Sequence, residues 1–207
     1  MSFSATDLAA ALDATELATT DAHAVSLMAC VVHSADSAAF AVEELHRRDA
    51  DPVMVSEILL QSTLFAGFPR ALNALHSQRE VFGATDSQPT ALEPVDLRHF
   101  RERGEALFRD IYRDHSDRVL DLLDSYHSEL RDWILVSAYG RVLARDGVAA
   151  STRELAACAA LTVSGDLRQL TSHARGARNV GASDADIVAT AQLISCLTDL
   201  PAPDMMS

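Results

Sequence analysis

The chain has 207 residues, of which 48% are hydrophobic and 23% are charged, a composition typical of a globular protein with a sizeable core. Its 17 basic and 30 acidic residues give a net charge of −13, which disfavours binding to nucleic acid or to an anionic membrane. The basic residues are all arginine, and the absence of lysine excludes Schiff-base, pyridoxal-phosphate and P-loop lysine chemistry.

The N-terminal segment MSFSATDLAAALDATEL is acidic, and we expect no signal peptide there. No apolar run reaches the length of about 18 residues that spans a bilayer, so no membrane segment is expected. Cys30, Cys158 and Cys196 lie far apart and form no C-x-x-C motif. We therefore expect buried, reduced thiols in a cytoplasmic protein, without a disulfide framework or a zinc knuckle.

Helix signals begin in the first third of the chain. Asp51 and Pro52 are a typical N-cap and first helical position, and they predict a helix over residues 52–66. Apolar residues at helical spacing predict two more helices, within residues 95–113 and 119–126.

The last third of the chain shows the same signals. Ser151 and Glu154 fit a capping box, which predicts a helix that ends near Gly165, and a second helix is expected over residues 166–181. A second capping box, formed by Ser183 with Asp186, predicts a helix over residues 184–198. No segment shows a sustained period of two, so we predict an all-α fold of about ten helices.

One stretch, GATDSQPTALEP at residues 83–94, is rich in helix-breaking residues and is interpreted as a linker. It divides the chain into an N-terminal unit, residues 1–82, and a C-terminal unit, residues 95–207. Sliding the sequence on itself by 132 residues lays helix 52–66 over helix 184–198, which suggests a duplication. The alternative is a coincidence, because generic helical spacing alone produces such matches.

The predicted hairpin of the last third carries a possible acid–base site. Asp166, Gln169 and His173 are spaced by three and four residues, so they share one face of the second helix. Glu154 lies on the first helix at a height within about 4–5 Å of His173, given a rise of 1.5 Å per residue. A carboxylate opposite an imidazole supports proton transfer. The alternative is structural: Glu154 caps its helix, and His173 hydrogen-bonds inside the hairpin.

The hairpin sequence RELAACAALTVSGDLRQLTSHARGARNVGAS, residues 153–183, resembles the core of the carboxymuconolactone decarboxylase and alkylhydroperoxidase D-like superfamily. The resemblance includes His173 and the later Asn179 and Gly181. It continues upstream through residues 129–155 and appears, displaced, at residues 57–82, where EILLQSTLFAGFPRALNALHSQREVF is similar to the segment after the histidine helix. The resemblance implies an all-α fold of tandem units of antiparallel helices.

The thiol-peroxidase branch of this superfamily carries a glutamate, two cysteines and a histidine at fixed spacing. The corresponding residues in this chain are Glu154, Asp166, Gln169 and His173. Both cysteines are absent, so we expect no thiol-dependent peroxidase activity. The decarboxylase branch also lacks the cysteine pair and keeps the histidine, although Glu154 replaces a small residue there.

In the N-terminal unit, the 132-residue offset places Ala22 at the Glu154 position and Ala41 at the His173 position. That unit is therefore predicted to carry no chemistry of its own. Its segment FAGFP, Phe65 to Pro69, is a candidate wall for a pocket.

The resemblance implies a cofactor-independent lyase that acts on a small carboxylic acid or lactone. His173 would be the general acid or base, and Glu154 would orient its imidazole. The candidate substrate-binding residues are Gln169, Asp166, Arg153 and Tyr139, with Arg168 as a second arginine for a substrate carboxylate. The alternative interpretation makes both arginines solvated surface residues and Tyr139 a packing residue.

Neither a cofactor nor a metal is expected. His115 with Asp114 and Asp117 is interpreted as a charged helix end rather than a metal cluster. Single-unit relatives resemble ring-forming hexamers, so a two-unit chain is expected to form a homotrimer with the same ring. The alternative to an enzyme is a non-catalytic scaffold or small-molecule binding protein that has lost the reaction.

Overall fold

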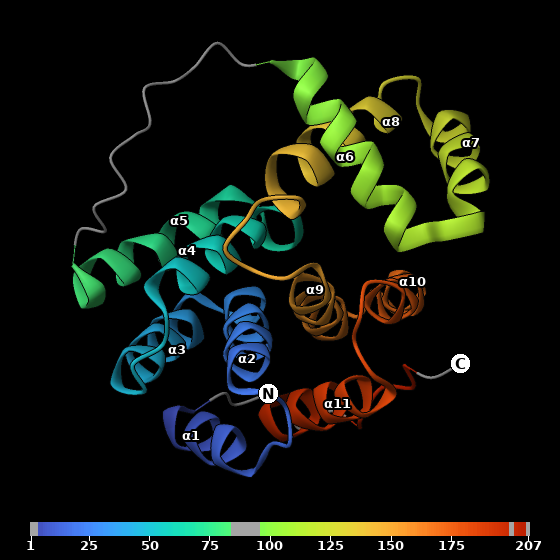
Figure 1. The fold of residues 1–207 in the computed structure, drawn as a ribbon. Helices are drawn as coiled ribbons and strands as arrows, with labels where there is room; N and C mark the ends of the chain where they lie inside the picture. Colours follow the sequence, from blue (N-terminus) through green and yellow to red (C-terminus); the bar gives the residue numbers. More distant parts are fainter. Residues whose placement is uncertain (1–3, 84–95, 199–200, 206–207) are drawn as a thin grey trace. The chain divides into compact units, whose positions relative to one another are not determined.

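The structure, a computed structural model, describes residues 4–83, 96–198 and 201–205. The described residues form helices joined by turns and contain no strand, which confirms the all-α prediction (Figure 1). The predicted linker 83–94 lies outside the described residues except for Gly83. This glycine directly follows the helix that ends at Phe82, and its φ is 82°.

The chain packs into two compact units, and their residue ranges differ from the division expected at residues 83–94. One unit comprises residues 1–85 and 147–207, and the other comprises residues 86–146. The physical reason lies in two apolar helices from opposite ends of the sequence, which cover each other in the first unit.

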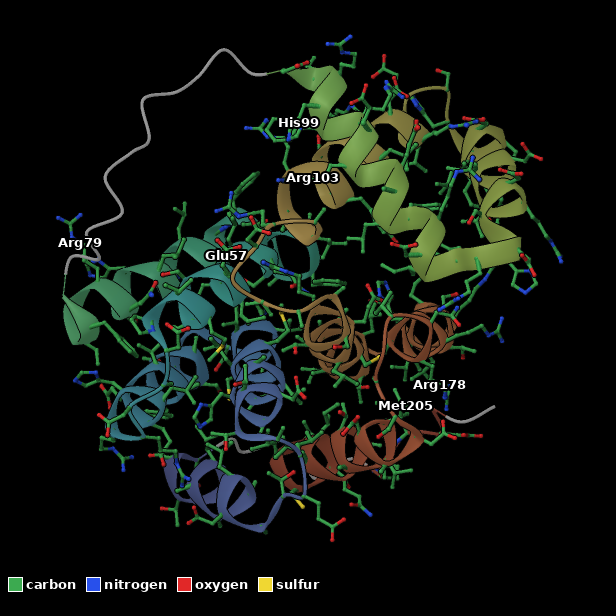
Figure 2. The ribbon with its side chains drawn as sticks, in the orientation of Figure 1. Glu57, Arg79, His99, Arg103, Arg178 and Met205 are labelled. Carbon is green, nitrogen blue, oxygen red and sulfur yellow. The ribbon has the colours of Figure 1, made fainter. Side chains whose placement is uncertain are left out.

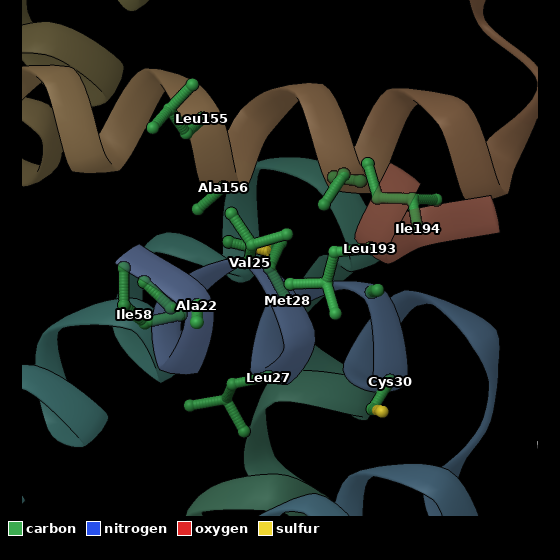
Figure 3. Close-up of a cluster of buried hydrophobic side chains, with 14 of the residues drawn as sticks. Ala22, Val25, Leu27, Met28, Cys30, Ile58, Leu155, Ala156, Leu193 and Ile194 are labelled. Carbon is green, nitrogen blue, oxygen red and sulfur yellow. The ribbon is translucent and has the colours of Figure 1, made fainter. Parts of the chain in front are cut away.

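These two helices are α2 (Thr19–His33) and α9 (Ala150–Ser164), and they pack against each other at the centre of the first unit (Figure 1). Residues 22–32 of α2 and 152–162 of α9 are buried on every side. A helix that is apolar around its whole circumference is stable only when other helices surround it. Figure 3 shows part of the resulting core, in which Val25 and Met28 of α2 lie beside Ala156 of α9.

Six further helices surround this pair in the first unit. They are α1 (Ala5–Ala14), α3 (Ala35–Arg47), α4 (Pro52–Gln61), α5 (Thr63–Phe82), α10 (Leu167–Asn179) and α11 (Asp184–Thr198). Helix α3 packs on α2, α10 packs on α9, and α11 contacts both central helices. The C-terminal segment is fixed to α10, because Arg178 donates to the carbonyl oxygen of Met205 at 3.0 Å (Figure 2).

Two of the three predicted helix starts are confirmed. Asp51 accepts a hydrogen bond from the backbone N–H of Val53 at 2.9 Å, with Pro52 at the start of α4. Ser183 and Asp186 form a reciprocal capping box at α11, with N–H to side-chain oxygen distances of 2.8 and 3.1 Å.

The third predicted start is wrong. Helix α9 begins at Ala150 after Ala149, which makes no side-chain capping bond, and Glu154 lies inside the helix. Its carboxylate bonds to His173 instead of capping the helix. A single Ser-x-x-Glu match therefore does not fix a helix terminus when the glutamate has a partner on another helix.

The helix bounds repeat along the chain. Helices α3 and α10 begin at residues 35 and 167 and end at 47 and 179, an offset of 132, and α4 and α11 begin at 52 and 184, the same offset. The central helices begin at 19 and 150, an offset of 131, because the turn before α10 is one residue longer. Aligned on these bounds, His23 and not Ala22 takes the position of Glu154.

A buried ionic cluster joins α3 to α1 in the first unit. Glu44 is 2% exposed and accepts from Arg48 Nε at 2.6 Å and from Arg47. Arg48 also pairs with Asp13 at 2.8 Å. Burial lowers the pKa of His23, the charge of Arg48 lowers it further, and Glu44 opposes both. The cluster ties α3 to the end of α1.

The second unit comprises α6 (Leu97–Tyr112), a 3-10 turn η1 (Arg113–His115), α7 (Ser116–Tyr126), α8 (Leu130–Asp132) and a π-helix η2 (Trp133–Leu143). Helices α6 and η2 cross in close contact at Gly104 and Gly140. A Cβ atom at Gly104 would lie 2.0 Å from the carbonyl oxygen of Leu135, so the crossing requires glycine at this position.

Candidate functional site

Glu154 of α9 and His173 of α10 form a hydrogen-bonded pair, as expected from the hairpin geometry. His173 Nδ1 lies 2.9 Å from Glu154 Oε2. The Glu154 side chain is 1% exposed and that of His173 is 16% exposed, so the carboxylate is sealed inside and the imidazole reaches the surface. The second carboxylate oxygen, Oε1, has no hydrogen-bond partner among the described residues.

The environment of His173 keeps its proton bound. Burial by itself would lower the pKa of His173, but the charge of Glu154 and its hydrogen bond to the ring raise the pKa above its ordinary value. A carboxylate beside Nδ1 requires a proton on that nitrogen, which leaves Nε2 to exchange protons with another molecule. Nε2 makes no hydrogen bond within the described residues.

Comparison with known proteins addresses this part of the chain. Residues 133–202, about a third of the sequence, match the model of the carboxymuconolactone decarboxylase family. The comparison with curated proteins gave no match to the chain.

The matched segment begins at the first residue of η2 and extends through α9, α10 and α11. It therefore contains both Glu154 and His173. It also contains the positions where the thiol-peroxidase pattern would place two cysteines, which are Asp166 and Gln169 in this chain.

Asp166 and Gln169 both lie exposed at the start of α10. The side chain of Asp166 accepts a hydrogen bond from Ser164 Oγ at 2.6 Å across the turn. Arg168 is exposed as well. The structure thus places these residues on the same helix as His173, and their expected contacts with a substrate stay predictions.

Cys158 lies one turn after Glu154 on α9 and is completely buried. Burial raises the pKa of the Cys158 thiol strongly, and the neighbouring charge of Glu154 raises it further. Burial also raises the pKa of the Cys30 thiol, to about 12. A thiol of this kind stays protonated at neutral pH and is a poor nucleophile.

Arg153 was expected either to bind a substrate carboxylate or to be a solvated surface residue. It is 1% exposed, so the surface interpretation is wrong. Its guanidinium pairs with Glu57 at 2.8 Å and donates to the side-chain oxygen of Gln61 at 3.3 Å. Gln61 in turn donates to the Arg153 carbonyl at 2.8 Å. Because Glu57 already neutralises Arg153, this arginine fastens α4 to α9.

Tyr139 lies in the second unit, within the π-helix, and is 5% exposed. Its ring packs edge-on against Phe108, with centroids 5.0 Å apart. This contact agrees with the packing role that was the alternative for Tyr139, and a role in substrate binding stays a prediction.

A cavity of about 430 Å³ lies in the first unit where α2 ends, α5 begins and α9 ends. It is lined by Val32, His33, Phe65, Ala66, Arg70, Val163 and Ser164. The FAGFP segment therefore contributes two wall residues. Phe65 also contacts the imidazole of His173 edge-on, with ring centroids 5.9 Å apart.

The other residues that line the cavity were not predicted from the sequence. Arg70 directly follows the FAGFP segment, which was the one available signal, but the contribution of His33 and Val163 depends on how three helices meet.

Within residues 4–83, 96–198 and 201–205, no group of three His, Cys, Asp or Glu side chains is placed to hold a metal ion. The helices described also include none of sufficient length and hydrophobicity to cross a membrane.

Proposed function

We propose that this protein is a cofactor-independent, decarboxylase-like lyase that acts on a small carboxylic acid or lactone. His173 is the general acid or base, and Glu154 orients the imidazole and stabilises its protonated form. The observation that carries the proposal is the 2.9 Å contact between a sealed carboxylate and an imidazole whose other nitrogen makes no hydrogen bond within the described residues.

The proposed step is a proton transfer to carbon. When the substrate loses CO₂, the electrons of the broken C–C bond remain on the product as a carbanion or enolate. The Nε2–H of the His173 imidazolium donates its proton to that carbon, which leaves neutral His173 with its remaining proton on Nδ1, toward Glu154. Water then returns a proton to Nε2.

The raised pKa of His173 supports this assignment, because it keeps part of the enzyme in the imidazolium form near neutral pH. A general acid is most effective when its pKa lies near the working pH. The match of residues 133–202 to the carboxymuconolactone decarboxylase family model agrees with the proposal, although a shared fold does not by itself specify the chemistry.

A second candidate function is the binding of a small molecule without turnover. The observation in its favour is the cavity, whose lining includes neither Glu154 nor His173. A protein that kept the fold and lost the reaction would bind a ligand there and show no turnover.

The test is a turnover screen of small carboxylates and lactones, with CO₂ release and substrate loss as readouts. We expect His173→Asn to lower turnover by about 10²–10⁴-fold, the usual contribution of an acid–base group, while the fold and the assembly state survive. Wild-type activity that survives His173→Asn, or that falls only in step with unfolding, would remove His173 from the mechanism.

The same screen includes tert-butyl hydroperoxide with a dithiol donor. We expect no thiol-dependent peroxide consumption, because the Cys158 thiol is buried and protonated. Peroxide consumption that disappears in Cys158→Ser would contradict this expectation and would favour a peroxidase.

A further inference from the structure

We propose that the cavity between the ends of α2 and α9 and the start of α5 is a binding site for a small organic carboxylate with an apolar body. The proposal concerns the cavity and its lining and does not depend on the proton transfer assigned to Glu154 and His173.

The charge of the lining selects an anion. The chain carries a net charge of −13, yet the described residues that line the cavity include Arg70 and His33 and no Asp or Glu. Burial lowers the pKa of His33, and nearby positive charge, that of Arg70 included, lowers it further, so Arg70 is a permanent cation on the described lining at neutral pH. One permanent cation suits a ligand with a single negative charge.

Arg70 has donors to spare for such a ligand. It donates one hydrogen bond, to the carbonyl oxygen of Val32 near the end of α2, and makes no other within the described residues. That contact fixes one branch of the guanidinium at the cavity wall. Because a guanidinium carries five N–H donors in a rigid fork, the remaining ones can bind a carboxylate. The hydroxyl of Ser164, on α9, also lines the cavity, but its proton is donated to Asp166 at 2.6 Å.

The rest of the lining is apolar and requires a ligand with a matching body. Val32, Phe65, Ala66 and Val163 contribute hydrocarbon from three helices. The cavity is open to the surface, and its volume of about 430 Å³ lies in the range of pockets that bind small organic ligands. Inorganic phosphate would satisfy Arg70 but would leave these walls without contacts, so an aromatic or branched aliphatic carboxylate fits better.

Phe65 provides a built-in reporter of occupancy. Its ring lines the cavity and contacts the imidazole of His173 edge-on at 5.9 Å between centroids. A ligand that packs against Phe65 should therefore shift the NMR signals of His173 as well as those of the Val32 and Val163 methyl groups.

The experiment is a titration of the full chain with benzoate, followed by calorimetry and by methyl and imidazole NMR. We expect saturable binding that shifts the Val32 and Val163 methyl signals. Benzyl alcohol, of similar shape without the charge, and inorganic phosphate, the charge without the apolar body, should each bind at least about tenfold more weakly.

The decisive variant is Arg70→Gln, which should weaken benzoate binding by about tenfold or more while the amide can still donate to Val32. Arg79→Gln is the matched control, since this arginine lies on α5 outside the cavity lining (Figure 2). Ala66→Leu, which fills the cavity and leaves Arg70 in place, should also abolish binding and covers the case in which Arg70→Gln does not fold.

Three outcomes would overturn the proposal: no saturable benzoate binding at millimolar concentration, equal affinity in Arg70→Gln, or equal affinity for benzyl alcohol. Because the readout is binding, it stands apart from the turnover screen. Benzoate binding without any turnover would support the cavity assignment and count against the proposed lyase. Turnover without benzoate binding would do the reverse.

Discussion

Glu154 determines the charge of His173, because its carboxylate opposes the effect of burial on the imidazole. Burial of the imidazole disfavours its charged form, whereas the carboxylate at 2.9 Å and its hydrogen bond favour that form and raise the pKa. Without a carboxylate, the same burial would make His173 a neutral imidazole. The pair therefore decides which protonation state the imidazole presents to another molecule.

Glu154→Gln should lower the pKa of His173 below its ordinary value of about 6.5, because burial then acts without an opposing charge. The amide oxygen can still accept from Nδ1–H, so the hydrogen bond can survive the change. An NMR titration of the imidazole measures the pKa directly. Glu80→Gln, an exposed glutamate near the exposed His76, is the control and should leave His173 unchanged.

The same pair sets a pH dependence of stability. The folded pKa of His173 lies above its unfolded value of about 6.5, so the folded protein keeps a proton that the unfolded chain releases. The contribution to the free energy of unfolding is complete below about pH 6.5 and is lost as the pH rises through the folded pKa. Chemical denaturation should show this slope in the wild type and not in Glu154→Gln; a parallel slope in both would contradict the assignment.

At the scale of elements, α4 and α9 are joined by a buried ion pair. Glu57 and Arg153 are 8% and 1% exposed, and Gln61 contacts both the side chain and the backbone of Arg153. Arg153 immediately precedes Glu154, so this contact also fixes the turn of α9 that carries the carboxylate.

Glu57→Gln should lower the free energy of unfolding by about 3–5 kcal/mol, because it leaves a buried guanidinium without its counter-charge. Urea denaturation measures the change. Glu43→Gln, an exposed carboxylate on α3, is the control and should stay within about 0.5 kcal/mol of the wild type. A small effect at Glu57 would show that solvent compensates Arg153.

The crossing of α6 and η2 in the second unit depends on glycine. A Cβ at Gly104 would meet the Leu135 carbonyl oxygen at 2.0 Å, and a Cβ at Gly140 would meet that of Phe100 at 2.1 Å. Backbone oxygens held in helices cannot rotate away as a flexible side chain can, so the helices themselves would have to separate.

Gly104→Ala should therefore destabilise the second unit by about 3 kcal/mol, although alanine is the better helix former. Hydrogen exchange of the amides in residues 97–143 localises the loss to this unit. Asp110→Ala, at an exposed position of the same helix, should have little effect. Unchanged protection in Gly104→Ala would show that the two helices can separate at no cost.

At the scale of the whole molecule, we expect self-association. The resemblance to ring-forming relatives predicts a trimer, and α5 exposes Phe68 and Leu72, which are 72% and 62% accessible and one helical turn apart. Large apolar side chains in such a position gain free energy when a second chain covers them.

Light scattering at micromolar concentration should give three times the chain mass of 22.3 kDa. Leu72→Arg should shift the mass to smaller species, because a charged side chain would be buried without a partner. Leu167→Arg, on α10, serves as the control for a non-specific effect of the added charge, since Leu167 is 60% exposed. A monodisperse monomer in the wild type would contradict the prediction.

The sequence by itself determined the class of fold and the acid–base pair, because both depend on local spacing. Helical periodicity and caps such as Asp51 and Ser183 act within one or two turns. The pairing of Glu154 with His173 required only a hairpin with a tight turn at Gly165, whose φ of 83° suits glycine.

Only the tertiary structure decided how the ends of the chain combine. The packing of α2 on α9, the burial of Arg153 against Glu57 and the convergence of His33, Arg70 and Val163 on one cavity join residues that are far apart in sequence. Such contacts follow from the burial of two wholly apolar helices, and hydrophobic burial is non-directional. Local pattern can show that a helix will be buried, but it cannot specify which distant helix will cover it.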